Sequence, residues 1–443
     1  MASKHKIRKH CFAGLESVAL LLSSLMFVPG LSQAQVGFTL ATGLEYIENP
    51  LRQGPSDDID YLSSTTASIV MDRQTKRFGT TLNYSANRQE YRYDIRNDQG
   101  IVNGLGIFTF KAIPNVFSWQ VTNARFNELV DASLPDIPDN RQDINTLTTG
   151  PVINLPINAV TLMGFSSQHG IVSFEQTDTL EQDRHSYNFY VSRIVSRLMQ
   201  ASLRASYTES QIDAIPGSDY TFLNLSASLE FNTDDYSLSA ELGQYSTERL
   251  GLQSDNPIYV FSGAVRVNSR LELTADFAQQ VDDLVSDLRG PGPVDQFFED
   301  SDRSLGATFG NSNQPNLYER ESINFGATYA VDSAFSLDVR YTNNQRTSIG
   351  FFAEEDDESI SANLGLPLPA QTRLTMAISA TKSKRNFSIR GLQDRDDFRV
   401  SGRYRLADRI GLTFFMAEVS QTADFELDNY DGLAVGVGLE YAR

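Results

Sequence analysis

Alternation between apolar and polar residues recurs along most of this chain and is the feature that most restricts its fold. The segment LELTADF at residues 271–277 is one example, and YVFSGAV at 259–265 precedes it across a short turn. A strand with this period of two has one apolar face and one polar face. In hydrocarbon, every backbone N–H and C=O group must be paired within the protein, so only helices and closed barrels can span a membrane. The pattern therefore predicts an all-β fold, a transmembrane antiparallel up-and-down β-barrel with apolar faces toward lipid and polar faces toward a lumen.

The connections between these segments switch regularly between short turns and longer loops. We expect nine short turns and ten longer loops, which join twenty strands and leave both chain ends on the short-turn side. The longer loops are expected near residues 48–59, 94–100, 127–143, 172–182, 213–218, 249–256, 281–319, 346–357, 383–396 and 421–429. Barrels of this kind place their short turns in the periplasm, so the N- and C-termini are expected there. Alternation is weakest at 101–110 and 144–155, which leaves eighteen strands as the alternative.

The first 34 residues have the pattern of a secretory signal peptide. Four basic residues within 4–9 precede an apolar core at 18–28, and SQA at 32–34 is typical of a cleavage site. The core is too short to span a membrane as a helix. We therefore expect a cleaved signal peptide at 1–34 and a single barrel domain at 35–443. An uncleaved anchor is the alternative.

Composition excludes several functions. Cleavage would remove Cys11, the only cysteine, so disulfides and cysteine metal sites are excluded. It would leave 33 basic and 55 acidic residues, a net charge of −22. Such acidity argues against nucleic acid as a partner, because phosphates are bound by Lys and Arg. His169 and His185 remain, too few for a histidine metal cluster, and we expect no cofactor.

Strand ends and the C-terminus point to membrane partners. Tyrosines at strand ends are expected to form aromatic girdles at the two membrane interfaces. They are Tyr91, Tyr93, Tyr187, Tyr190, Tyr329, Tyr341, Tyr404 and Tyr441. The segment GLAVGVGLEY at 432–441 resembles the terminal strand that barrel-assembly machinery reads, although two residues follow its last tyrosine. Outer-membrane lipid, lipopolysaccharide and that machinery are the expected partners.

Parity along each strand predicts which side chains line the lumen. Most are Ser, Thr, Asn and Gln, which exchange hydrogen bonds with water or sugar hydroxyls without holding a solute tightly. The charged residues expected to face inward are Arg204, Glu241, Glu272, Asp276, Asp338, Arg340, Arg399, Arg403 and Arg405. Arg399, Arg403 and Arg405 form a candidate track for an anionic polymer.

Two charge clusters stand out near the C-terminal end. Basic residues are concentrated in 382–405, and residues 354–358 form an acidic stretch that we expect to be a loop. One interpretation is a basic stripe that guides an anionic polymer, with an acidic loop that binds divalent ions or repels other solutes. The interpretation that we favour is solvated loops together with wall pairs that balance each other. The long loop at 281–319 either folds into the lumen as a constriction or covers the barrel from outside.

Some outer-membrane barrels hydrolyse lipids, and this chain has a few residues of the types that such catalysis needs. Ser167 and His169 are close in sequence, and Asp183 and His185 follow across one loop. A nucleophile needs its base within hydrogen-bond reach. Parity predicts His169 inward and His185 outward, so the two should not share a site, unless the register slips by one residue. We therefore expect no enzyme activity and no catalytic residues.

The opening of the barrel resembles the β-barrel porin 2 family. The resemblance is confined to GLEYIENPLR at 43–52, the Asp-rich stretch DDID at 57–60 and a strand pair ending at Tyr91. Asn49 and Arg52 are the motif positions that carry over. Related barrels accompany the secretion of polysaccharides, so the resemblance implies exopolysaccharide export, with polysaccharide and periplasmic export components as partners. The alternatives are a general diffusion porin for small solutes and a closed structural or adhesive barrel.

Overall fold

The structure is a computed structural model that describes residues 35–442 apart from parts of the connections. The gaps are 53, 55, 131–133, 135–136, 178–179, 213–218, 250, 284–316, 332–334, 350–353, 368–372 and 389–390. The signal peptide expected at 1–34, and nearly all of the long loop expected at 281–319, lie outside the described residues.

The described residues form twenty β-strands, as the alternation predicts, rather than eighteen. The two segments with the weakest alternation are both strands. The strands are β1 (Gln35–Glu48), β2 (Ile59–Gln74), β3 (Phe78–Tyr91), β4 (Gln99–Ile113), β5 (Phe117–Leu129), β6 (Arg141–Asn158), β7 (Thr161–Phe174), β8 (Gln182–Ser196), β9 (Met199–Gln211), β10 (Tyr220–Asn232), β11 (Tyr236–Arg249), β12 (Leu252–Arg266), β13 (Leu271–Asp283), β14 (Leu317–Val331), β15 (Phe335–Ser348), β16 (Glu354–Pro367), β17 (Leu374–Phe387), β18 (Gly391–Ala407), β19 (Ile410–Ala423) and β20 (Tyr430–Ala442).

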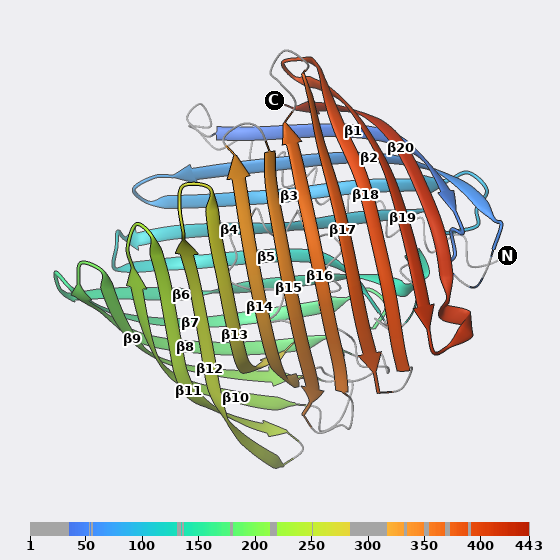
Figure 1. The fold of residues 1–443 in the computed structure, drawn as a ribbon. Coiled ribbons are helices and arrows are strands. Elements are labelled where there is room, and N and C mark those ends of the chain that lie inside the picture. Colours follow the sequence, from blue (N-terminus) through green and yellow to red (C-terminus); the bar gives the residue numbers. More distant parts are fainter. Residues whose placement is uncertain are drawn as a thin grey trace.

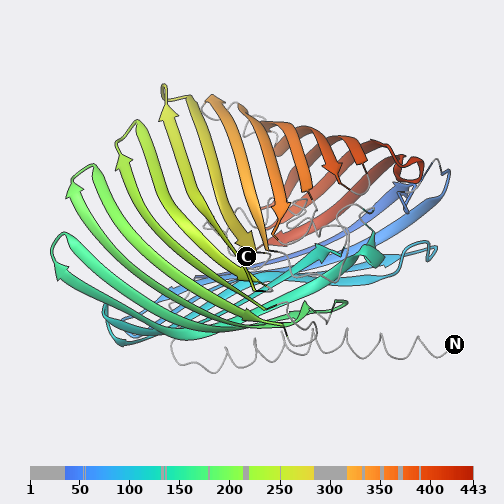
Figure 2. The same cartoon turned by 90° about the horizontal axis from the view of Figure 1, so that it is seen from below.

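Each strand pairs antiparallel with its neighbour in the sequence, and β1 pairs with β20, so the sheet closes. In Figure 1, β14–β19 run steeply across the front, whereas β1–β8 lie behind at a large angle to them. Seen from below, the wall of strands curves around the interior (Figure 2). Closure pairs every strand edge, which a membrane-spanning sheet requires. We call the end where β1 stops, at Glu48, the loop end and the opposite end the turn end.

The outer face is apolar, as the alternation predicts. Leu44 is 64% exposed and Leu203 is 62% exposed, which would be unfavourable in water and is favourable against lipid. Aromatic rings meet on this face toward both ends of the strands. Tyr187 and Tyr207 stack with ring centroids 6.4 Å apart toward the loop end, and Phe78 and Phe110 lie 5.4 Å apart near the turn end.

Two of the tyrosines expected in these girdles face the interior instead. Tyr91 is buried and pairs in register with Leu62, which lines the lumen. Tyr190 alternates with the outward-facing Phe189, and its hydroxyl donates to Oδ1 of Asn154 at 2.8 Å. Position near a strand end therefore does not by itself place a tyrosine at the membrane interface. The tyrosine must also lie at a position of the strand that faces outward.

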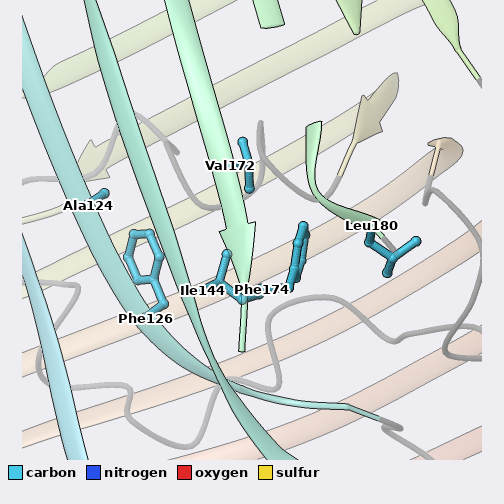
Figure 3. Packing of buried hydrophobic residues seen from close by; sticks show 6 residues of the cluster. All are labelled: Ala124, Phe126, Ile144, Val172, Phe174 and Leu180. Carbon is cyan, nitrogen blue, oxygen red and sulfur yellow. The ribbon is translucent and has the colours of Figure 1, made fainter. Parts of the chain in front are cut away.

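Part of the interior is packed with apolar side chains at the loop end. The first cluster comprises Ala124, Phe126, Ile144, Val172, Phe174 and Leu180, from β5–β7 and the connection after β7 (Figure 3). The second comprises Ile212, Tyr220, Tyr245, Ile258, Val281 and Leu317, from β10–β14 and the adjoining connection. The first cluster therefore lies inside the wall formed by β5–β7, and the second lies inside the wall formed by β10–β14.

Three of the expected long loops are reduced to connections of five residues or fewer. The connections after β11, β15 and β17 span only 250–251, 349–353 and 388–390, where loops were expected at 249–256, 346–357 and 383–396. The strands there continue as polar ladders beyond the apolar belt, so their ends lack the alternation that marks the membrane-facing part. Two short 3-10 helices, Pro138–Asn140 and Glu426–Asp428, lie in the connections. Within the described ranges, none of the helices has the length and apolarity needed to cross a membrane.

Candidate lumenal site

A cavity of about 1390 Å³ lies inside the barrel, and inward-facing residues of β1–β3 and β11–β20 line it. Its wall carries many hydroxyl and amide groups, including Ser64, Asn87, Ser239, Thr274, Thr342 and Ser379. These strands lie away from the first apolar cluster, which occupies β5–β7. The hydroxyl and amide groups of the cavity wall are suited to hydroxylated solutes.

The strand register places all nine charged residues expected to line the lumen on the inner face. Their neighbours along each strand are the exposed apolar residues of the outer face, such as Leu203 beside Arg204 and Leu242 beside Glu241. Asp276, Arg340 and Arg399 line the cavity. The others that face inward are Arg204, Glu241, Glu272, Asp338, Arg403 and Arg405.

The three arginines of the expected polymer track are not equivalent. Arg399 lines the cavity, and its guanidinium carbon lies 4.5 Å from the centre of the Phe415 ring. Arg403 donates to Oε1 of Glu440 at 3.0 Å, so its charge is partly neutralised. Arg405 is exposed near the turn end of β18. The three arginines share one face of β18, but the local charge that a solute would meet differs from one arginine to the next.

Four ion pairs form a belt across β13–β18 near the loop end. They are Asp282–Arg320 at 3.0 Å, Arg346–Glu355 at 3.5 Å, Asp357–Arg385 at 3.6 Å and Arg395–Asp397 at 2.8 Å. Each arginine has a carboxylate partner, so this part of the wall carries balanced charge. The favoured interpretation of the two charge clusters, pairs that balance each other, agrees with this belt.

The sequence predicts a loop at the acidic stretch 354–358, and this prediction is wrong. These residues form the first part of β16. Alternation sends Glu355 and Asp357 inward to the ion-pair belt, whereas Glu358 pairs in register with the outward-facing Lys384. Lys382, also outward, forms an ion pair with Asp396 at 3.4 Å. The basic segment 382–405 is therefore divided between the two faces of the sheet and is not one stripe.

Asn49 and Arg52, the two motif positions, both lie in the connection after β1 and line the cavity. Both have left-handed backbone conformations, with φ of 46° and 50°. Asparagine tolerates this conformation well, and its side-chain amide donates to the carbonyl oxygen of Gly54 at 2.9 Å. Nε of Arg96, in the next long connection, donates to the carbonyl oxygen of Pro50. Asn49 thus shapes the loop that presents Arg52 to the cavity.

The seam where the barrel closes brings together residues from both ends of the chain. Glu45 of β1 pairs in register with Gly436 of β20, and Gly436 pairs with Phe415 of β19. Glu45 lies within electrostatic range of Arg399, as well as of Arg96 and Arg52. Neither Glu45 nor Phe415 was singled out from the sequence. Parity alone places both inward, but only closure of the barrel brings them beside Arg399.

The two histidines lie together, contrary to the prediction from parity. His169 and His185 are register partners on β7 and β8, and their ring centroids are 4.7 Å apart. Both share the outer face with Phe165 and Phe189, so His169 is not inward. In the described part of the chain, however, Ser167 makes no side-chain hydrogen bond to either ring. The nucleophile–base contact that catalysis needs is thus not assembled.

In the same described residues, no group of three or more histidine, cysteine, aspartate or glutamate side chains is placed to hold a metal ion.

A closed antiparallel barrel with an apolar exterior and a hydrated polar interior is the architecture of an outer-membrane β-barrel. No protein-family model and no curated protein matches the sequence. Solved structures similar to the chain include the FrpB iron transporter from Neisseria meningitidis (F5-1 variant, apoprotein form), with 10% identity, a TM-score of 0.51, and coverage of 92% of this chain and 81% of that one. Another is a point mutant of the ferric enterobactin receptor PfeA from Pseudomonas aeruginosa, with 10% identity, a TM-score of 0.50, and coverage of 92% of this chain and 80% of that one. At this identity the similarity concerns the fold alone.

Proposed function

We propose that this protein is a passive outer-membrane channel that carries a secreted exopolysaccharide through its hydrated lumen. The single observation that carries the proposal is the cavity of about 1390 Å³ with its wall of hydroxyl and amide groups. Hydroxyl and amide groups bind sugar hydroxyls weakly and repeatedly, as transit requires. A barrel of this strand number is wide enough to leave an aqueous path unless its interior is filled.

Balanced charge in the ion-pair belt supports a largely uncharged, hydroxyl-rich cargo. Four arginines of the belt each face a carboxylate, so they create little net attraction for a strongly charged solute. The inward face of β18 adds a weaker, local preference for anionic groups through Arg399 and Arg405. In this proposal, acidic groups on the polymer would meet these arginines during transit.

The remaining parts of the proposal concern location and partners. Residues 1–34 act as a cleaved signal peptide, and both termini of the mature barrel lie in the periplasm, where export components deliver the polymer. Asn49 and Arg52, which line the cavity from the opposite, loop end, lie where the polymer leaves the barrel.

Single-channel conductance of the refolded mature chain, residues 35–443, tests the proposal. It is measured with and without polysaccharide purified from the host, and polyethylene glycol of matched size serves as the control polymer. We expect an open conductance that the host polymer blocks from the turn end and that polyethylene glycol blocks less. Open conductance without selective block would favour a small-solute porin. No conductance would favour a closed structural or adhesive barrel.

A further inference from the structure

The closing seam of the barrel combines an apolar floor with two charged side chains that have no ion-pair or hydrogen-bond partner among the described residues. Four residues in register form one row across the seam. Arg399 of β18 pairs with Ala417 of β19, and Ala417 pairs with Ala434 of β20. Ala434 in turn pairs with Ile47 of β1. Ala417, Ala434 and Ile47 all line the cavity. Arg399 and Glu45 therefore stand on either side of a floor of small or apolar residues.

The two charged side chains lie on the two outermost of these four strands and do not pair with each other. Their strands are three inter-strand spacings apart, about 14 Å along the wall. They are within electrostatic range of one another. In the part of the chain that is described, however, neither side chain forms a hydrogen bond or an ion pair. This distinguishes them from the belt on β13–β18, where every arginine has a carboxylate within 4.0 Å.

Phe415 holds the arginine in place. A Cβ atom at Gly436 would lie 2.3 Å from Cε1 of Phe415, so the ring lies flat across this glycine. The guanidinium of Arg399 lies over the same ring, 4.5 Å from its centre. A cation–π contact of this kind restricts the guanidinium while leaving its N–H groups free to donate.

We propose that Glu45, Arg399 and the floor formed by Ala417 and Ala434 make a saccharide-binding subsite that holds one sugar ring of the transiting polymer. The apolar floor suits the C–H face of a pyranose, the Glu45 carboxylate accepts hydrogen bonds from hydroxyls, and the Arg399 guanidinium donates to ring and hydroxyl oxygens. This inference rests on the proposed function, because it names the contact that the transported polymer makes in the lumen.

Binding in detergent tests the subsite without requiring conductance. The probes are neutral gluco-, galacto- and manno-oligosaccharides of six units, measured by isothermal titration calorimetry and by saturation-transfer NMR against the folded barrel. Glu45→Ala and Arg399→Gln should each weaken binding of the preferred oligosaccharide by about tenfold or more, the loss expected for a hydrogen bond to a charged group. Folding of every variant is checked by its heat-modifiable migration in gel electrophoresis.

Two variants provide matched controls. Glu230→Ala removes an inward-facing glutamate of β10 that does not line the cavity, and Lys382→Gln removes a cation from the outer face of the sheet near Arg399. Both should bind oligosaccharide as the unaltered chain does. If no oligosaccharide binds, or if the controls lose as much affinity as the site variants, the subsite is wrong. Binding that depends on Glu45 and Arg399 in a barrel with no conductance would retain the subsite and overturn the channel.

Discussion

Arg403 and Glu440 form an ion pair across the inner face of the barrel, with Nη2 of the arginine 3.0 Å from Oε1 of the glutamate. The pair joins β18 to β20 over the intervening β19 and lies in the turn-end half of the wall. The charge that a passing solute meets on this face therefore depends on a carboxylate from the last strand as well as on the arginines.

Removal of that carboxylate should make the lumen more attractive to anions. Glu440→Gln leaves the guanidinium of Arg403 without its counter-charge, so the reversal potential in a salt gradient should shift toward anion selectivity. Glu230→Gln, on the opposite part of the wall, removes the same charge without releasing an arginine and should cause a smaller shift. Equal shifts in the two variants would mean that only the net charge of the lumen matters.

The arginines near the turn end of β18 should affect charged polymers and spare neutral ones. We expect the double change Arg403→Gln with Arg405→Gln to shorten the block of the channel current by anionic polysaccharide, because two cations on one face are lost. Block by a neutral polysaccharide of the same length should be unchanged. The measurement is the dwell time of single blocking events at low and high salt, since screening should reduce the difference. A loss for both polymers would contradict an electrostatic track.

The buried member of the ion-pair belt should contribute to stability. The side chain of Glu355 is 4% exposed and that of Arg346 is 13% exposed. Glu355→Gln leaves a buried guanidinium uncompensated, which should reduce the free energy of unfolding by about 3–5 kcal/mol. Asp396→Asn breaks the exposed pair with Lys382 and should cost about 0–1 kcal/mol. Urea unfolding in lipid vesicles, followed by fluorescence of the single tryptophan, Trp119, measures both.

The glycine beneath Phe415 should be intolerant of any side chain. Gly436→Ala places a methyl group where the ring lies, so overpacking of about 1–3 kcal/mol is expected, together with weaker oligosaccharide binding as the Arg399 contact shifts. Gly100→Ala is the control, because a Cβ there meets nothing within 4 Å. The comparison uses the same urea titration. Unchanged stability and binding in Gly436→Ala would mean that the ring moves aside without consequence.

The sequence alone predicts the membrane-facing part of this barrel well because lipid enforces alternation there. Strand number and the inward parity of residues such as Arg340 and Asp276 follow from that rule. The rule weakens where a strand extends beyond the apolar belt. At 354–358 every residue is acidic, so the sequence looks like a loop although its two faces have different partners.

Two other features depend on information that alternation does not contain. In β7 the run SSQHG at 166–170 has no apolar residue to indicate which side chains face outward. A shift of one residue exchanges the inward and outward faces of the strand. The prediction that His169 faces inward is wrong for this reason. Glu45 could be placed on the inner face by parity. Its position opposite Arg399, however, depends on the pairing of the first strand with the last, which no local pattern records.

That pairing also determines where the residues of the seam come from in the chain. Four strands, β18, β19, β20 and β1, supply the floor and the two charged groups at the seam, and β1 leaves the ribosome first whereas the others leave it last. In a sheet where β1 and β20 have not joined, Glu45 lies on one edge strand and Arg399 lies two strands inside the opposite edge. Closure of the barrel therefore brings together the two halves of the proposed saccharide subsite, so a chain in which β1 and β20 have not joined would lack that subsite.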